Sequence, residues 1–379
     1  MEENFNQQSR RKFLYSLAVA GLGIPLLSAT NKCSSESLTK EEFAKQKQKG
    51  KLGIALVGLG GYAGGQLAPA LLQTEHCYLA GIVTGTPSKI PTWKEKYGIP
   101  DQNIYSYETF DRIKDSKDID IIYIVLPNAL HAEYVIRAAE AGKHVICEKP
   151  MALSVADCDK MIAACKKANR LLSIGYRLHF EPYNLEMQRL GQQKIFGDVK
   201  EVKAGFGFPI NNPSQWRLTQ DLAGGGPMQD VGIYCVQGLC YTSGMNPLAV
   251  TAKEGPKTDL QKFREVEQSV SWKMEMPNGL ICEGATSYAD SMNYLHAVAE
   301  KGKFGLTSAF NYTSQKGYIN DEPMNFPLVN QQARQMDDFA LCVKNNRPTK
   351  VPGEMGRRDV NIIQSIYTSM RTGQRVAIK

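Results

Sequence analysis

The sequence predicts an α/β protein of two domains: a parallel sheet wound by helices, then a second α/β domain with a large open, mostly antiparallel sheet. Two observations carry this prediction. Between residues 51 and 175, short apolar runs alternate with helix-compatible segments, which is the pattern of parallel strands joined by crossover helices. Over 176–379 the apolar residues recur with a period of two instead, which is typical of half-buried antiparallel strands.

The elements of the first half follow one another with short connections. We expect strands at 52–57, 78–83, 121–126, 143–147 and 171–175, and helices at 63–73, 91–97, 131–141 and 154–168. Right-handed crossovers between such strands give a doubly wound sheet whose carboxyl ends face a ligand crevice.

The second half combines alternating strands with helices. The period-two runs lie at 199–206, 267–274 and 279–285, and the expected helices lie at 182–190, 227–243 and 359–371. Because a bare apolar sheet face is costly in water, we expect a homodimer or homotetramer built by packing of this open sheet.

The turn after the first strand is rich in glycine. Gly58 allows a tight turn, Gly60 lets a pyrophosphate approach the backbone, and Ala63 lets the next helix pack on the strand. Free N–H groups at the start of that helix attract phosphate. Ordinary strand–turn–helix connections share the pattern, but the buried strand before it and the strand at 78–83 favour a Rossmann dinucleotide site. The residues assigned to this site are Gly58, Leu59, Gly60, Gly61, Tyr62 and Ala63.

The end of the second strand distinguishes NAD from NADP. A carboxylate there would bind the ribose hydroxyls and repel a 2′-phosphate. In this chain Val83 is followed by Thr84, Thr86, Ser88 and Lys89, with no carboxylate. Hydroxyls and an ammonium can bind a phosphate, so we predict NADP, with a polar turn that binds nothing as the alternative.

The strand at 143–147 leads into Glu148, Lys149 and Pro150. Its carboxyl end faces the crevice, so we expect Lys149 to point at the ligand beside the nicotinamide. The ammonium can stabilise a developing alkoxide or relay a proton, and Pro150 makes a cis peptide bond possible. In isolation, a Lys before a Pro is more typical of a surface turn.

The amino-terminal residues have the features of an export signal. Residues 9–14 (SRRKFL) form a twin-arginine motif, and a modest apolar region follows at 14–27, with the expected cleavage site after Ala29. We therefore expect a signal peptide over 1–29, a linker or arm over 30–50, and a periplasmic protein whose cofactor is loaded before export. A disordered basic tail is the alternative. Cys33 could carry a lipid, although Lys32 before it is unfavourable for lipidation.

Composition excludes several classes of protein. A chain of 379 residues can form two or three domains with a large core. The net charge of +7 is spread along the chain, so we expect no nucleic-acid partner, and no segment after the signal is apolar enough to cross a membrane. The nine cysteines form no CxxC pair and no metal-ligand spacing, so we expect buried free thiols, no disulfide framework and no metal.

Several motifs, in order along residues 52–379, resemble those of the Gfo/Idh/MocA oxidoreductases, and most closely their glucose–fructose oxidoreductase branch. The motifs are YSY at 105–107, LPNALHAE at 126–133, AGKHVICEKPMA at 141–152, GYR at 175–177, QWRL at 215–218, LAGGG at 222–226, DVGIY at 230–234 and PGE at 352–354. The resemblance implies a Rossmann domain covering 51–175 and a substrate-binding and oligomerisation domain covering 176–379. It also implies an active site between them, NADP held without release, and sugar substrates.

The resemblance also assigns residues to the site. It implies that Thr84 and Lys89 hold the 2′-phosphate and that Glu148 and Lys149 lie at the nicotinamide. The other implied contacts with cofactor or sugar are Tyr107, Pro127, Asn128, His131, Arg177, Trp216 and Arg217. One departure is the segment 30–50, which is short, charged and free of proline, whereas glucose–fructose enzymes have a Pro-rich arm that covers the adenine.

Asp230 and Tyr234 join Lys149 as the candidate catalytic residues. Their i, i+4 spacing puts both on one face of a helix. A phenol with a pKa near ~10 is a poor base at neutral pH, but a nearby ammonium favours the phenolate. Our hypothesis is that Tyr234 takes the proton of the sugar C1 hydroxyl, Lys149 assists electrostatically, and Asp230 orients the sugar or Lys149. Without the resemblance, a buried structural Asp/Tyr pair is the simpler interpretation.

Together these observations indicate a periplasmic enzyme that oxidises an aldose to its lactone and reduces a ketose on the same NADP. The alternatives are a single-substrate NADP-dependent sugar or polyol dehydrogenase, an NAD-dependent glycosidase of the same family, and a nucleotide-binding protein without turnover. Intact Lys149, Asp230 and Tyr234 argue against the last. The absence of a carboxylate after Val83 argues against the glycosidase.

Overall fold

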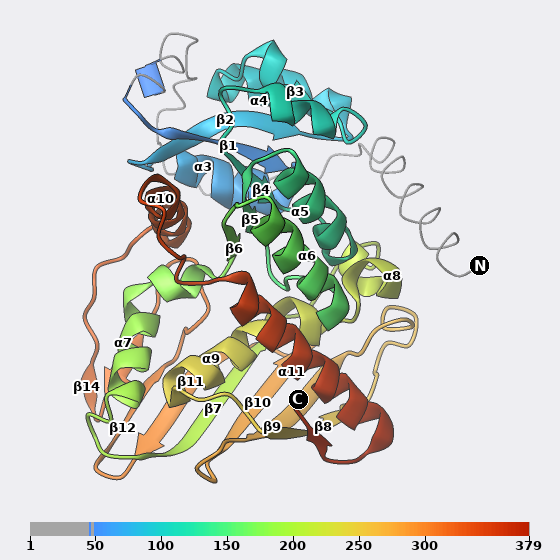
Figure 1. The fold of residues 1–379 in the computed structure, drawn as a ribbon. Helices are drawn as coiled ribbons and strands as arrows, with labels where there is room; N and C mark the ends of the chain where they lie inside the picture. Colours follow the sequence, from blue (N-terminus) through green and yellow to red (C-terminus); the bar gives the residue numbers. More distant parts are fainter. Residues whose placement is uncertain (1–44, 47–48, 379) are drawn as a thin grey trace.

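The computed structural model describes residues 45–46 and 49–378, so the predicted signal peptide over 1–29, Cys33 and most of the predicted linker lie outside the described residues. The described chain forms two sheets with helices against them (Figure 1). Sheet A is six-stranded and parallel, and sheet B is nine-stranded and mostly antiparallel. The predicted fold class is confirmed.

Sheet A has the strand order β3-β2-β1-β4-β5-β6. Its strands are β1 (Leu52–Val57), β2 (Cys77–Val83), β3 (Ile104–Tyr105), β4 (Ile121–Ile124), β5 (His144–Cys147) and β6 (Leu172–Ile174). Helices cover both faces, which is why every residue of β2 is buried. The strand order reverses between β1 and β4, and the connections that leave the carboxyl ends of these two strands diverge, leaving a crevice.

The helices of this half differ slightly from the prediction. They are α3 (Ala68–Leu71), α4 (Ile90–Tyr97), α5 (His131–Glu140) and α6 (Val155–Lys167). The helix expected at 63–73 begins as a π-helical turn over Ala63–Leu67. Pro69 has no N–H to donate to the preceding turn, and Gly64 and Gly65 favour helix only weakly, so a regular α-helix starts late here.

Sheet B has the order β14-β13-β12-β11-β7-β10-β9-β8-β15, with one parallel pair, β7 and β10. Its strands are β7 (Val199–Gly207), β8 (Ala249–Glu254), β9 (Ser269–Glu275), β10 (Ile281–Ser287), β11 (Met292–Ala299), β12 (Gly302–Leu306), β13 (Gly317–Ile319), β14 (Glu322–Pro323) and β15 (Val376–Ala377). Sequence periodicity predicted only β7, β9 and β10. Most of the other strands are short or contain glycine, and this weakens the alternation of apolar and polar residues in their sequences.

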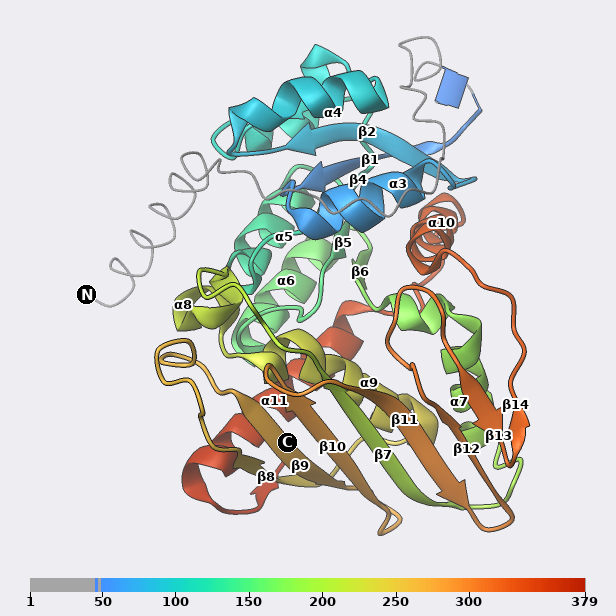
Figure 2. The ribbon, with the colours of Figure 1, turned by 180° about the vertical axis from the view of Figure 1, so that it is seen from behind.

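Helices cover one face of sheet B. These helices are α7 (Pro182–Gln192), α9 (Ile233–Ser243) and α11 (Gly353–Thr372), and the short helix α8 (Gln220–Ala223) accepts a hydrogen bond from Asn128 at its Ala223 carbonyl. Among the described helices, none covers the opposite face (Figure 2). That face is less apolar than we expected, because Glu283 pairs with Lys203 and Lys273, at 3.6 Å and 2.8 Å, and His296 stacks on Tyr294.

A helix that the sequence analysis missed, α10 (Gln331–Lys344), returns from the second half to sheet A. Its Met336 and Phe339 are buried in the same cluster as Ile54 and Leu56 of β1. The Asp337 carboxylate accepts the backbone N–H groups of Glu75 and His76, at 2.9 Å and 2.7 Å. The carboxyl-terminal part of the chain therefore completes the core around sheet A.

Replacing Phe339 tests this packing. Phe339→Ala should lower the free energy of unfolding by about 3–5 kcal/mol, because it leaves a cavity between α10 and sheet A. Urea unfolding followed by fluorescence measures the change, with Lys344→Ala on the exposed end of α10 as a control that should stay within about 0.5 kcal/mol of wild type. Equal stability of the two variants would contradict the role given to α10.

Candidate active site

A cavity of about 770 Å³ lies between the carboxyl edge of sheet A and the turn that leads into α9. Most residues predicted for the site line it. From the first half these are Gly58, Leu59, Gly60, Gly61, Tyr62, Thr84, Lys89, Tyr107, Pro127, Asn128, Glu148 and Lys149. From the second half they are Arg177, Trp216, Arg217, Asp230 and Tyr234.

The glycine turn that follows β1 forms one wall of the cavity. Gly58 has φ +94°, and a Cβ there would lie 2.5 Å from the Val125 carbonyl oxygen, so only glycine fits. At Gly60 and Gly61 a Cβ would meet no atom within 4 Å, because the backbone borders the open cavity. This bare backbone at a helix start suits a diphosphate.

The end of β2 supplies hydroxyls and an ammonium to the same cavity. Lys89 donates from Nζ to the Leu59 carbonyl at 2.8 Å, and the Thr86 N–H donates to Thr84 Oγ1 at 3.0 Å. Among the described residues, the carboxylates that line the cavity are Glu148 and Asp230, and neither follows β2. The sequence predicts no carboxylate at the end of β2, and among the described residues the folded cavity has none there.

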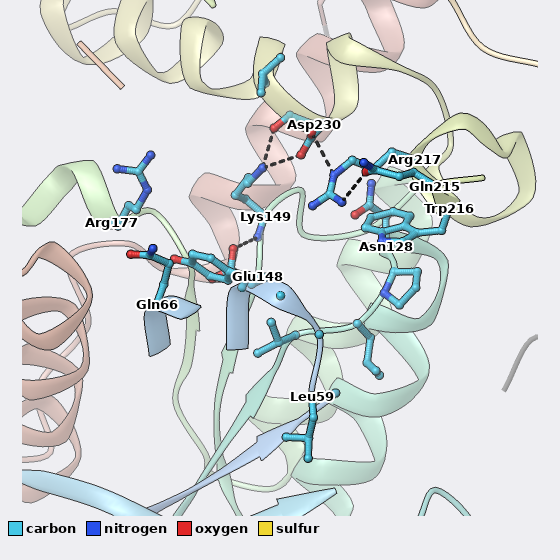
Figure 3. A pocket seen from close by; sticks show the side chains of 18 of the residues that line it. Leu59, Gln66, Asn128, Glu148, Lys149, Arg177, Gln215, Trp216, Arg217 and Asp230 are labelled. Atoms are coloured by element: carbon cyan, nitrogen blue, oxygen red, sulfur yellow. Dashed lines mark hydrogen bonds and ion pairs between the residues drawn. The ribbon is translucent and has the colours of Figure 1, made fainter. Parts of the chain in front are cut away.

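Lys149 reaches from the end of β5 to Asp230 of the second half (Figure 3). Its Nζ donates to the Asp230 carbonyl oxygen at 2.5 Å and to Asp230 Oδ1 at 3.3 Å. The same Nζ lies 4.7 Å from the centroid of the Tyr234 ring. The Lys149–Pro150 bond is cis, as the sequence allowed. The three candidate catalytic side chains thus lie together in one cavity.

Asp230 belongs to a π-helical turn, Met228–Gly232, that precedes α9. Its Oδ2 accepts from Arg217 Nε at 3.1 Å and from the Tyr288 hydroxyl at 2.9 Å. Burial alone would raise the pKa of Asp230, but the Arg217 and Lys149 cations outweigh it and hold this pKa well below its usual value. Asp230 is therefore ionised at neutral pH and fixes both cations.

Glu148 lies beneath Lys149 and faces the cavity (Figure 3). The Tyr123 hydroxyl donates to its Oε1 at 2.7 Å, and Gln335 of α10 donates to the Tyr123 hydroxyl at 3.0 Å. Burial raises the pKa of Glu148. A Cβ at Gly175 would lie 2.6 Å from this carboxyl, so glycine makes room for it.

Two predicted site residues do not line the cavity. His131 is fully buried, with its ring nitrogens 2.9 Å from the Leu126 and Pro150 carbonyl oxygens. One ring N–H can therefore donate to a loop carbonyl, and the contact between His131 and the cofactor stays a prediction. Ala63 is also fully buried and packs behind the glycine turn, which agrees with the packing role given to it.

The cavity also has walls that the prediction left out. Aromatic side chains of β7 and of the segment after β12 form much of them, and Phe206 lies 5.6 Å from the ring of Tyr234. The added lining residues are Gln66, Val125, Leu126, Phe206, Phe208, Gln215, Val231, Phe310, Asn311 and Tyr312, and Thr86, one of the hydroxyls named for phosphate binding, lines the cavity too. Alternation along β7 and into the residue after it could have indicated Phe206 and Phe208, but residues 310–312 lie in irregular backbone that has no sequence pattern.

Other predictions concern cysteines, metals and membranes. The eight cysteines within the described residues are free and buried, as expected. Within residues 45–46 and 49–378 there is no group of three His, Cys, Asp or Glu side chains placed to hold a metal ion. In the same part of the chain, no helix has the length and apolar character needed to span a bilayer.

Asp230→Asn should lower the free energy of unfolding by about 3–5 kcal/mol at pH 7, because two partly buried cations would lose their counter-charge. The folded pKa of Asp230 is lowered. The ionised Asp230 carboxylate therefore contributes its full stability above the pKa of an unfolded Asp, near ~3.9. That stability is lost as the pH falls through the lower pKa of the folded state. Urea unfolding at a series of pH values should give a constant difference from wild type near neutrality that shrinks below about pH 4. A difference that widens with acid would contradict this assignment.

Comparisons with known proteins agree with this arrangement. The oxidoreductase family with an NAD-binding Rossmann fold, Gfo/Idh/MocA, matches residues 52–176, and the Gfo/Idh/MocA C-terminal domain matches residues 184–305. The chain is similar to the crystal structure of an aldose–aldose oxidoreductase from Caulobacter crescentus complexed with glycerol. The two are 41% identical over 86% of this chain and 99% of that one, with a TM-score of 0.84.

Two more distant proteins extend the comparison. A D-xylose 1-dehydrogenase [NADP(+)] of Haloarcula marismortui is 27% identical over 338 residues, 86% of this chain and 92% of that protein. A probable dehydrogenase from Thermotoga maritima shares the fold at 20% identity, over 86% of this chain and 99% of that one, with a TM-score of 0.73. With both domains matched in order and a solved relative aligned over nearly its whole length, the chain belongs to the Gfo/Idh/MocA family of oxidoreductases.

Proposed function

We propose that the protein is an NADP-dependent sugar oxidoreductase that oxidises an aldose at C1 and passes the two electrons to a second sugar on the same bound cofactor. The observation that carries the proposal is the meeting of Lys149, Asp230 and Tyr234 in one cavity with the glycine turn. An ammonium and a phenol side by side are suited to removing a proton from a hydroxyl.

The cavity residues fit NADP. Gly60 and Gly61 offer backbone without a Cβ for the diphosphate, and Thr84 and Lys89 offer a hydroxyl and an ammonium for the 2′-phosphate. Glu148 and Lys149 would then lie at the nicotinamide end. When bound, NADP supplies the hydride acceptor for the first half-reaction and the donor for the second.

The chain's own residues handle the proton. In the first half-reaction C1 would give its hydride to bound NADP, the C1 hydroxyl proton would pass to the Tyr234 oxygen in its phenolate form, and C1 would become the lactone carbonyl. Lys149 stabilises the developing negative charge on the C1 oxygen. Asp230, held by Arg217 and Tyr288, fixes the position of Lys149. In the second half-reaction Tyr234 returns the proton to the carbonyl oxygen of the acceptor sugar.

The identity of the acceptor decides between two versions of this activity. The sequence motifs favour a ketose, whereas the Caulobacter relative is described as an aldose–aldose oxidoreductase. A second candidate, an NADP-dependent aldose 1-dehydrogenase that exchanges its cofactor, is supported by the similarity to the Haloarcula xylose dehydrogenase. Nucleotide retention separates the second candidate from both versions of the first.

Location and assembly belong to the same proposal. We infer export to the periplasm from the twin-arginine motif at 9–14, which cell fractionation of the full chain tests.

We infer a homodimer or homotetramer through the uncovered face of sheet B, where Ile281 and Val298 are exposed beside the ion pairs. Sedimentation of wild type and Val298→Lys tests that assembly, since a like charge facing its copy would weaken it.

Absorbance of the purified protein tests the activity. Protein purified without added nucleotide should absorb near 340 nm after glucose is added, because reduced nicotinamide absorbs there. A second sugar, fructose in one sample and an aldose in another, should remove this absorbance without release of nucleotide. A nucleotide that is lost on a desalting column would favour the single-substrate dehydrogenase instead.

Tyr234→Phe tests the proton acceptor. Without the phenolic oxygen, turnover should fall by about 10²-fold or more while the reduced cofactor still binds. Rapid-mixing absorbance at 340 nm measures the rate of the first half-reaction. The matched control is Tyr97→Phe, since Tyr97 is buried against Trp93 of α4 and does not line the cavity. A near-normal rate in Tyr234→Phe would rule out the general-base role.

A further inference from the structure

A continuous stack of side chains crosses the end of the cavity where Lys149 and Tyr234 lie. The Arg177 guanidinium carbon lies 5.0 Å from the Tyr234 ring centroid and 4.4 Å from that of Tyr312. Tyr312 in turn stacks on Tyr62, with centroids 5.9 Å apart and an interplanar angle of 28°. Tyr62 belongs to the glycine turn of the first half, whereas Tyr312 comes from the segment between β12 and β13. The stack therefore joins the two sides of the cavity.

The segment that carries Tyr312 is irregular but firmly held. Arg177 donates to the Asn311 carbonyl at 3.1 Å and to the Phe310 carbonyl at 2.6 Å. Gln331, the first residue of α10, donates to the Asn311 and Tyr312 carbonyl oxygens, both at 3.0 Å. These bonds fix the backbone on either side of the ring, so Tyr312 is a positioned side chain although it is 40% exposed.

Arg177 is almost fully buried and donates to the two carbonyl oxygens and the Gln331 side chain, and its guanidinium also bonds the Tyr234 hydroxyl. A guanidinium that has lost its water gains more from an aromatic face than an exposed one does. The ring of Tyr312 therefore has a strong partner on one side and Tyr62 on the other. Both tyrosines line the cavity that the dinucleotide would fill.

We propose that Tyr312 is a cofactor-retaining residue. Through Tyr62 it ties the glycine turn to the second half of the chain across the cavity, so a bound dinucleotide leaves only after this aromatic contact opens. The proposal rests on the proposed function, in which one NADP serves both half-reactions. It adds a residue of the second half, outside every motif recognised in the sequence, to the set that holds the cofactor.

The dissociation rate of the nucleotide tests this role. Wild type, Tyr312→Ala and Tyr312→Phe are loaded with NADPH, and release is followed by fluorescence after mixing with excess NADP. Tyr312→Ala should release NADPH about tenfold faster or more, a change of about 1.4 kcal/mol in the barrier. Tyr312→Phe keeps the ring and should release at the wild-type rate. Tyr318→Ala, which removes a ring that stacks on His296 away from the cavity, is the matched control.

Each outcome decides the proposal. Equal rates in wild type and Tyr312→Ala would overturn it, and so would fast release from Tyr312→Phe, because the ring would then not be the retaining element. Tyr62→Leu and the Tyr62→Leu/Tyr312→Ala double variant show whether the contact itself matters: the two single effects should not add. If they add fully, the stack is not the cause. Rapid release from wild type would instead contradict the retained-cofactor function, while the ratio between variants still tests Tyr312.

Discussion

The contact between Lys149 and Asp230 is the constraint on which the site depends. Lys149 follows strand β5 of sheet A, Asp230 lies in the turn before α9, and 81 positions separate them in the chain. Two partly buried charges are costly to hold apart, so their pairing fixes how the two halves meet. Since Asp230 also binds Arg217, a third segment is drawn to the same point. The cavity has its shape because these three segments converge on one carboxylate.

The support below this contact comes from a part of the chain that lies far away in sequence. Gln335 of α10 bonds Tyr123 of β4, and Tyr123 bonds Glu148 beside Lys149. The same helix buries Phe339 against sheet A. The Gln335 amide N–H and the Tyr123 hydroxyl are both used in this chain, so α10 supports the floor of the cavity as well as the core. His131 lies between the Leu126 and Pro150 carbonyl oxygens of two cavity loops, and its single ring N–H can bond one of them.

The two ends of the cavity differ in chemistry. At the end formed by the glycine turn and β2, bare backbone N–H groups and Lys89 suit negative charge. At the other end, cations lie against aromatic rings, with Lys149 and Arg177 both within 5.0 Å of the Tyr234 centroid. One end is suited to holding a phosphorylated dinucleotide, and the other to moving a proton next to it. This division follows from strand order, because only a sheet with a reversal point opens such a crevice.

The sequence by itself determined the fold class, the glycine turn, the acid-free end of β2 and most cavity residues of the first half. These features are local: Gly58 needs a positive φ, and Lys149 follows a buried strand whose direction is known. The rest of the prediction, including the roles of Asp230 and Tyr234, came from motifs that resemble those of the Gfo/Idh/MocA family. Only the tertiary structure decided that His131 is buried between two cavity loops, that α10 returns to sheet A, and that Tyr312 crosses to Tyr62. Those results depend on contacts between residues distant in the chain, for which neither helical nor strand periodicity provides a signal.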